Sequence, residues 1–204
     1  MIDILAMMYM ICSMNIVFTN GKGGVGKSTL SLLLYSALKQ AHKNVAVQDW
    51  DAQGTSNKSL AITGGEKADL TKSYDLLIYD TPPSLTHVAT TTAMATADLV
   101  LIVTSPSIAD LWEAASAAQY AREHAPKAHT RLLFNKVRKG TVGSRMIDKG
   151  AKQIGIEPLH CSLSMRECYQ HSLAGGWSAL DSSAREEVLQ LAMEILALPL
   201  EPRV

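Results

Sequence analysis

One glycine-rich stretch has the residue types and spacing of a phosphate-binding loop: Gly21, Lys22, Gly23, Gly24, Val25, Gly26, Lys27 and Ser28. It fits G-x-x-x-x-G-K-[ST], a pattern whose glycines let backbone N–H groups turn inward around phosphate oxygens. The pattern places Lys27 against the β and γ phosphates and the Ser28 hydroxyl on Mg²⁺. An apolar run precedes the loop, and a helical run opens at Thr29. Because a simple tight turn does not account for this match, we predict nucleotide binding at residues 21–29.

A second pattern supplies a carboxylate for the metal ion. Asp80 closes residues 75–80, in which four apolar or aromatic residues end on an aspartate, as in a Walker B motif. An aspartate at such a strand end can hold Mg²⁺, usually through water. The following Thr81, Pro82 and Pro83 can act as a switch that senses the γ-phosphate. In order after the glycine loop, this pattern indicates a Mg²⁺-dependent site.

Lys22 is a lysine that a general phosphate-binding loop does not require. With it, the motif resembles the deviant Walker A sequence, K-G-G-x-G-K-[ST], of the ParA/MinD family of ATPases. In that family the early lysine crosses a dimer interface to touch the partner's nucleotide. The resemblance therefore implies an ATP-sandwich homodimer that Lys22 completes. A solvated loop lysine is the alternative interpretation.

The resemblance extends to residues 49–54, which are similar to the family's D-x-D-P-Q-G element. It implies that Asp51 orients the water that attacks the γ-phosphate and that Asp49 lies near the Mg²⁺ ion. Ala52 stands where the family usually has proline, which affects the expected rigidity of the loop but not the carboxylates. The alternative is a turn with two solvated aspartates.

Two stretches in the second half of the chain also resemble this family. Asn135, at the end of a strand expected over 131–137, resembles a residue that contacts adenine in several members; an asparagine that caps a turn is the alternative. Residues 162–178 resemble a block of small plasmid-partition ATPases, which matches in register at Arg166, Tyr169, Ser172, Gly175 and Ser178. The resemblance then covers Met14 to about Leu198.

The expected elements place these motifs at strand ends. Continuous apolar runs predict strands near 14–20, 44–49, 75–80, 98–104 and 131–137, and helical patterns follow at 29–38, 108–124 and 183–198. Alternating strands and helices predict an α/β fold of three layers with a mostly parallel, doubly wound sheet, the architecture of P-loop NTPases. On the helix at 108–124, one apolar face is expected to contact the core or a dimer partner: Ile108, Leu111, Trp112, Ala115 and Ala118.

Length and composition favour one globular domain at 14–204, because 47% of the 204 residues are hydrophobic. Residues 1–13 are apolar, but they lack a basic region and a cleavage site and are too short to span a bilayer. They are either an upstream-start artefact or a short packing element. Three cysteines without a C-x-x-C pair favour a reduced, cytoplasmic protein.

The charges are segregated although the net charge is zero. Residues 122–152 contain nine basic residues against two acidic ones, a net charge of +7. This segregation indicates an anionic partner, with a solvated basic face as the alternative. We predict nonspecific contacts with DNA phosphates at Arg138, Lys139, Arg145, Lys149, Lys152 and Arg166.

The function implied by the resemblance is that of a ParA-type ATPase with ATP and Mg²⁺ as cofactors. Such a protein dimerises on ATP, binds nucleoid DNA nonspecifically and positions a cargo through slow hydrolysis that a ParB- or ParG-like adaptor stimulates. A plasmid is the first expected cargo, and a carboxysome or a chemoreceptor cluster is the alternative.

Three rival functions are less favoured. A MinD-like cell-division regulator would carry a basic amphipathic tail for the membrane, whereas the last helix here has an acidic polar face with Glu186, Glu187 and Glu194. An electron donor of the nitrogenase iron-protein kind needs two cysteines, and residues 81–107 contain none. A small-molecule enzyme such as a dethiobiotin synthetase is disfavoured by Lys22 together with the paired aspartates.

Overall fold

The computed structural model describes residues 14–138 and 140–199, so the predictions for residues 1–13 lie outside it. Its five strands form one sheet in the order β2-β3-β1-β4-β5, and every neighbouring pair is parallel. The expectation of a mostly parallel sheet is thus confirmed in its stricter, fully parallel form. The strands are β1 (Met14–Thr19), β2 (Val45–Asp49), β3 (Leu76–Asp80), β4 (Leu99–Thr104) and β5 (His129–Phe134).

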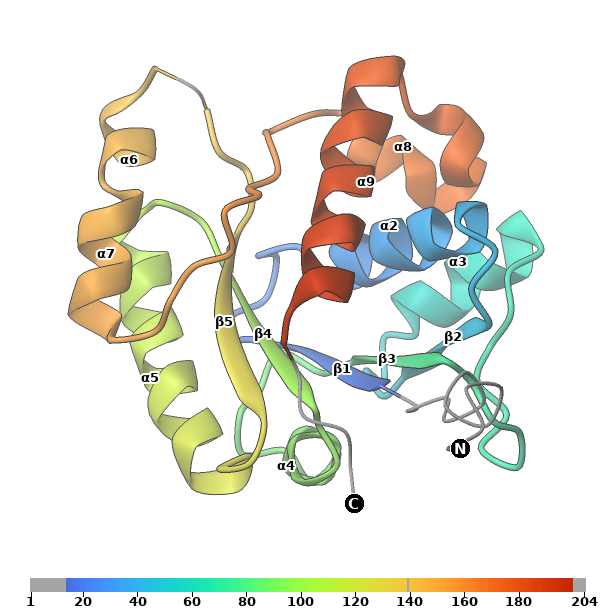
Figure 1. Cartoon of the computed structure of the whole chain (residues 1–204), viewed down its shortest axis with the longest axis horizontal. Helices are drawn as coiled ribbons and strands as arrows, with labels where there is room; N and C mark the ends of the chain where they lie inside the picture. Colours follow the sequence, from blue (N-terminus) through green and yellow to red (C-terminus); the bar gives the residue numbers. More distant parts are fainter. Residues whose placement is uncertain (1–13, 139, 200–204) are drawn as a thin grey trace, which may run out of the picture.

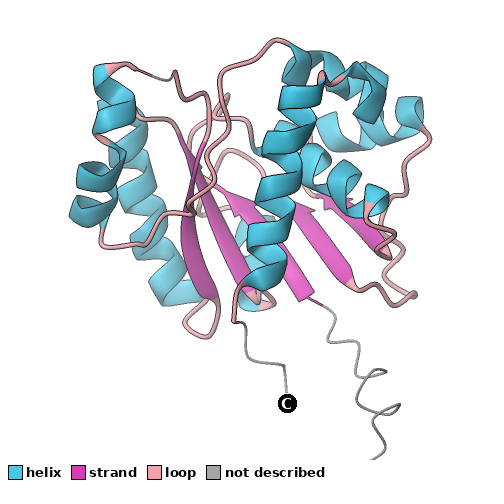
Figure 2. Cartoon of the chain, turned by 45° about the horizontal axis from the view of Figure 1, so that its top comes forward, coloured by secondary structure: helices cyan, strands magenta, loops and turns pink. Residues whose placement is uncertain are grey.

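Helices cover both faces of the sheet, so the described chain has three layers (Figures 1 and 2). They are α2 (Lys27–Gln40), α3 (Thr55–Thr63), α4 (Val88–Ala95), α5 (Ile108–His124), α6 (Val142–Arg145), α7 (Ile147–Ile154), α8 (Cys168–Gly175), the 3₁₀ helix η1 (Gly176–Ala179) and α9 (Ser182–Ala197). Because both faces are covered, the strands contain runs of successive buried apolar residues rather than a strict alternation, and β4 is buried along its whole length.

Successive residues of β1 show how the core is divided. Ile16 and Phe18 point into a cluster that contains the inner faces of α2 and α9, whereas Val17 points into a second cluster that contains α5. All three side chains are fully buried. The central strand is therefore fixed from both sides, which makes it a rigid support for the loop that follows it.

The expected apolar face of α5 lies only partly in the core. The helix packs on the sheet through a row of alanines, Ala114, Ala117, Ala118 and Ala121, all with no exposed surface. Ile108 and Trp112 are instead 67% and 71% exposed. Small side chains let a helix approach a sheet closely, so the alanine row prevails over the bulkier row beside it.

The acidic polar face of α9 contacts another part of the chain. Glu187 and Glu194 do not face solvent alone, because their carboxylates accept hydrogen bonds from the backbone N–H groups of Ser164 and of His160 and Cys161. These three donors belong to the segment that follows α7. Helix α9 thus binds a distant stretch of backbone through two acidic residues of its polar face.

Candidate nucleotide-binding site

The functional side chains gather at the carboxyl edge of the sheet. Asp49 and Asp80 end the neighbouring strands β2 and β3 and are register partners, and Phe18 of β1 is the partner of Asp80 on its other side. Asn20 follows β1 directly, and Asn135 follows β5 directly. Ligands bind at this edge in open α/β sheets. The structure therefore brings the motifs together as the sequence predicted.

The glycine loop is held in shape by its neighbours. Gly26 caps α2 with φ 106°, a left-handed conformation that side chains rarely adopt, and a Cβ there would lie 2.3 Å from Asn135 Nδ2. Asn135 donates this amide to the carbonyl of Val25 at 2.8 Å, and Lys136 donates its ammonium to the carbonyl of Gly24 at 2.6 Å. Only glycine fits at Gly26, since both the dihedral angle and the space require it.

Lys27 points its ammonium into the loop. The side chain is buried, and Nζ lies 3.3 Å from the carbonyl oxygen of Asn20 and 3.2 Å from that of Lys22. Burial lowers the pKa of Lys27, and the nearby carboxylates of Asp80 and Asp51 oppose this shift. The loop thus presents a partly desolvated cation, which a phosphate can pair with strongly.

Asp80 is the buried acid of the site. One of its oxygens accepts a hydrogen bond from Ser56 Oγ at 2.7 Å, whereas Oδ1 has no hydrogen-bond partner among the described residues. The pKa of Asp80 is raised to about 6: burial is the largest cause, the neighbouring Ser56 and Ser28 hydroxyls oppose the rise, and Asp49 adds to it.

These residues fit a Mg²⁺ ion. The Ser28 hydroxyl and the free oxygen of Asp80 are hard oxygen donors at one place. In the part of the chain that the structure describes, no group of three or more His, Cys, Asp or Glu side chains could hold a metal. Beside a nucleotide, water and phosphate oxygens would complete the coordination of Mg²⁺.

Asp49 and Asp51 differ in their surroundings. The two carboxylate oxygens of Asp49 accept the backbone N–H groups of Asp51 at 3.0 Å and of Asn57 at 2.9 Å. Asp49 therefore holds the loop and the first turn of α3, and its predicted place near Mg²⁺ stays a prediction. Asp51 is half-buried and lines the cleft, with one oxygen on the N–H group of Gln53 at 3.0 Å.

Lys22 is paired within its own chain. Its ammonium contacts the carboxylate of Asp110 at the start of α5, and Ser105 Oγ donates to the other carboxylate oxygen at 2.6 Å. Burial alone would raise the pKa of Asp110, but the hydrogen bonds from Lys22 and Ser105 more than offset it and lower the pKa. The lysine that distinguishes this motif is therefore not a free loop cation in this chain.

A cleft of about 780 Å³ extends from the loop. Its lining includes the predicted residues Gly23, Gly24, Gly26, Lys27, Ser28, Thr29, Asp51 and Asn135. It also includes residues that the sequence analysis did not assign to the nucleotide: Lys136, Arg138, Ser164, Met165, Arg166, Glu167, Tyr169, Gln170 and Leu173. Lys136 directly follows Asn135 at a strand end, and this position was the signal that could have identified it.

The predicted DNA-contact residues separate into two groups. Arg145, Lys149 and Lys152 are exposed on α6 and α7, and no ion pair engages them within residues 14–138 and 140–199. Arg138 and Arg166 line the nucleotide cleft instead. The last predicted contact, Lys139, lies outside the described residues.

A parallel sheet with a glycine loop between its central strand and α2, and with carboxylates at the ends of two neighbouring strands, defines a P-loop nucleotide-binding protein. The family model described as the CobQ/CobB/MinD/ParA nucleotide binding domain matches residues 16–175. The chain therefore belongs to this family, as the resemblance of its motifs implied.

Individual relatives agree with this assignment. The maintenance of carboxysome distribution protein A of Halothiobacillus neapolitanus is 26% identical, with 87% of this chain and 94% of that protein covered. The MinD of the Aquifex aeolicus MinC:MinD complex has a TM-score of 0.76 at 18% identity and covers 93% of this chain and 98% of its own.

Two further solved structures hold nucleotides. A plasmid partition protein from Borrelia burgdorferi bound to AMPPNP has a TM-score of 0.72 at 16% identity, with 90% of this chain and 98% of that chain covered. The MinD of Pyrococcus horikoshii complexed with Mg-ADP has a TM-score of 0.72 at 16% identity, with 91% and 97% covered. The prediction of ATP and Mg²⁺ as cofactors is thus confirmed at the level of the family. Among the described helices, none is long and apolar enough to cross a membrane.

Proposed function

We propose that this protein is a ParA-type ATPase that forms a homodimer around ATP, binds DNA nonspecifically in that state, and releases it after hydrolysis. The observation that carries the proposal is the pair of lysines in one intact loop. Lys27 points into the loop as a phosphate ligand, and Lys22 stands at its rim in an ion pair with Asp110. A phosphate-binding loop needs only the first of these lysines.

The residues of one chain supply most of the hydrolytic chemistry. The N–H groups of the loop and Lys27 offset the charge that develops on the γ-phosphoryl group, and Asp51 holds a water in line with it. Ser28 and Asp80 would hold Mg²⁺, which neutralises phosphate charge when bound. The cleft lining brings Lys27, Ser28 and Asp51 to one space, which supports this division of roles.

Dimerisation adds the remaining cation. To reach the nucleotide of a partner chain, Lys22 must leave Asp110. The ion pair is partly exposed, with 44% of the Lys22 side chain accessible, so its loss costs little beside the charge-assisted contact with a phosphate. Assembly and catalysis are coupled in this scheme, since the site is complete only in the dimer.

The DNA-binding surface is reduced to α6 and α7. Arg145, Lys149 and Lys152 are exposed there and supply phosphate contacts without reading bases. Pairing two such surfaces doubles the number of phosphates neutralised, so ATP binding would switch DNA binding on. An adaptor protein that stimulates slow hydrolysis, and a cytoplasmic, nucleoid-associated location, complete the proposal.

Two kinds of cargo have support. The block at 162–178 resembles plasmid-partition ATPases, which favours a plasmid. The relative from Halothiobacillus neapolitanus is named for carboxysome distribution and covers 87% of this chain, which favours a carboxysome-type cargo. The genes beside this one distinguish the two, because a cargo adaptor is commonly encoded next to its ATPase.

Phosphate release with ATP and Mg²⁺ tests the enzymatic part of the proposal. The wild-type protein should hydrolyse ATP only when Mg²⁺ is present, and Lys27→Ala should abolish the activity. Lys43→Ala, which changes an exposed lysine outside the cleft, is the matched control and should keep the wild-type rate. A wild-type protein that neither binds nor hydrolyses ATP contradicts the proposal.

A further inference from the structure

Glu187, on α9, collects hydrogen bonds from three residues far away in the sequence. Its Oε1 accepts Ser164 Oγ at 2.7 Å and the Arg166 guanidinium at 2.9 Å. Its Oε2 accepts the backbone N–H of Ser164 at 3.0 Å and the Tyr169 hydroxyl at 2.8 Å. Only 13% of the Glu187 side chain is exposed, so these four donors replace most of its water.

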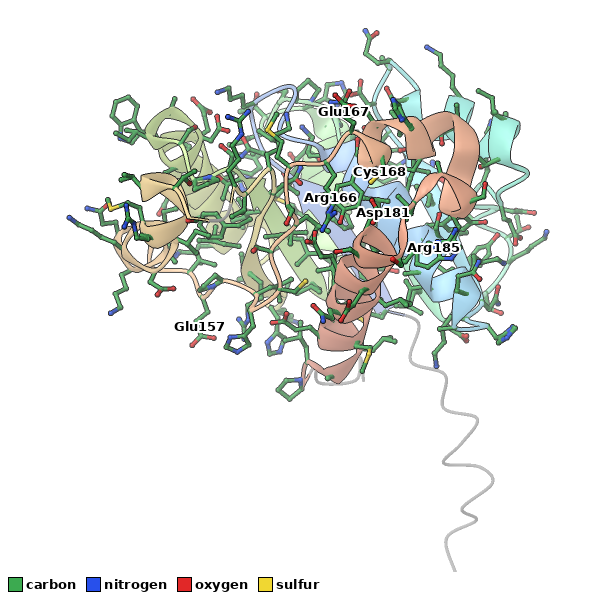
Figure 3. The ribbon with its side chains drawn as sticks, turned by 90° about the horizontal axis from the view of Figure 1, so that it is seen from above. Glu157, Arg166, Glu167, Cys168, Asp181 and Arg185 are labelled. Atoms are coloured by element: carbon green, nitrogen blue, oxygen red, sulfur yellow. The ribbon has the colours of Figure 1, made fainter. Side chains whose placement is uncertain are left out.

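All three donor residues, Ser164, Arg166 and Tyr169, line the nucleotide cleft, whereas Glu187 itself does not. We call the part of the lining formed by Ser164, Arg166 and Tyr169 the wall. The carboxylate of Glu187 lies outside the cleft and connects these three residues, which face the cleft. Arg166 also contacts Asp181 and Ser183 at the beginning of α9, and Figure 3 shows Arg166 beside Asp181 where the segment before α8 meets α9. The wall is therefore anchored on α9 and not on the sheet alone.

The other side of this wall is attached to the sheet. The N–H group of Leu163 donates to the carbonyl of Phe134 at the end of β5. Further along, the N–H group of Val137 donates to the carbonyl of Leu163, and that of Met165 donates to the carbonyl of Val137. The next residues after β5, Asn135 and Lys136, hold the glycine loop through its carbonyls. Hydrogen bonds, with short backbone steps between them, thus connect Glu187 to the residues that support the phosphate-binding loop.

The charge of Glu187 matters as well as its shape. Burial alone would raise the pKa of Glu187, but the hydrogen bonds from Arg166, Ser164 and Tyr169 lower it to about 2. The carboxylate is therefore ionised at neutral pH and balances the Arg166 guanidinium, whose pKa it raises. Removal of the charge would leave Arg166 with the more distant Asp181, 3.9 Å away.

The two ends of the cleft have different tasks. Phosphates bind to the glycine loop, so the nucleoside is left with the rest of the lining. Most of that lining comes from Asn135, Lys136, Arg138, Ser164, Met165, Arg166, Glu167, Tyr169, Gln170 and Leu173. We propose that Glu187 is a positioning residue that holds this nucleoside-facing wall in place. The proposal rests on the proposed function, and it adds a determinant on α9, which lies beyond the residues 16–175 that the family model matches.

Glu194 provides a matched control on the same helix. It also accepts two backbone N–H groups, from His160 and Cys161, both at 2.7 Å. Neither of these residues lines the nucleotide cleft. Glu187→Gln and Glu194→Gln therefore make the same chemical change at two backbone-binding carboxylates, of which only one is connected to the wall.

The test is calorimetric titration of the full chain with ATP and, separately, with inorganic tripolyphosphate, in Mg²⁺. Glu187→Gln should weaken ATP binding by about tenfold or more while tripolyphosphate binding changes less than about twofold. Glu194→Gln should leave both affinities within about twofold of wild type. In steady-state hydrolysis, Glu187→Gln should raise KM more than it lowers kcat, because the phosphate end is intact.

Tyr169→Phe and the double variant with Glu187→Gln extend the test. If the carboxylate acts through the wall, the two losses of ATP affinity should be less than additive. Equal ATP affinity in Glu187→Gln and wild type, or parallel losses of ATP and tripolyphosphate, would overturn the inference while the proposed function stands. Should Glu187→Gln fail to fold, Tyr169→Phe and Ser164→Ala each remove one donor, and an unchanged ATP affinity in both would overturn it.

Discussion

At the scale of single residues, the site depends on positions that accept one residue type only, such as an aspartate or a glycine. Asp51 is the residue whose role separates binding from catalysis. Asp51→Ala should lower kcat by about 100-fold, because a water that is no longer held in line reacts far more slowly. The ATP dissociation constant should stay within about threefold, since the phosphate and metal contacts persist in the ground state. Single-turnover hydrolysis and ATP titration check this, and a wild-type rate refutes the assignment.

Gly26 tests the geometry of the loop. Gly26→Ala places a Cβ 2.3 Å from Asn135 Nδ2 at a φ of 106°, so ATP binding should be lost together with stability. Gly64→Ala is the control, because Gly64 has φ 69° with no atom within 4 Å of its added Cβ. It should lower the free energy of unfolding by about 1 to 2 kcal/mol and leave ATP affinity unchanged. Comparable ATP affinity in both variants would show that the contact with Asn135 is not limiting.

At the scale of elements, the apolar runs of the sequence predicted all five strands, because a parallel sheet covered on both faces buries most of its strand residues. The motifs then lie at one edge of the sheet, since parallel strands end on the same side.

The partners of Lys22, Ser164 and Arg166 could not be predicted. Their contacts join segments about 20 to 90 residues apart, and no local pattern encodes which charged side chains will meet. The sequence could not decide between core and dimer contact for Trp112, because two apolar rows compete on α5, and in the single chain Trp112 is exposed.

The stability that Glu187 contributes by connecting α9 to the wall should depend on pH. The folded pKa of Glu187 lies at about 2, below its ordinary value of 4.5. A lowered carboxyl pKa contributes stability that is present above 4.5 and is lost as pH falls toward 2. The Tm difference between wild type and Glu187→Gln should therefore narrow over this range. Thermal melts from pH 7 to pH 2.5 measure it, and a constant difference would mean that the charge of Glu187 contributes nothing.

At the scale of the whole molecule, a protein with zero net charge presents three exposed basic residues, Arg145, Lys149 and Lys152, on the adjoining helices α6 and α7. Affinity of the ATP-bound state for duplex DNA should fall with salt at a log-log slope of about −0.9 per phosphate contacted. Lys149→Ala and Lys152→Ala should each reduce this slope by roughly one per copy. Lys43→Ala, at the end of α2 away from the cleft, should not change it. Equal DNA affinity of the ADP-bound and ATP-bound states would contradict the proposal that ATP switches DNA binding on.

The central claim is that ATP assembles a dimer that Lys22 completes, and sedimentation velocity tests it most directly. Asp51→Ala with saturating ATP and Mg²⁺ should sediment as a stable dimer, because the trapped nucleotide is not hydrolysed, and the same protein with ADP should sediment as a monomer. Lys22→Ala added to Asp51→Ala should remain monomeric with ATP although it binds the nucleotide. A monomer for Asp51→Ala under saturating ATP, or an undiminished dimer without Lys22, would contradict the account.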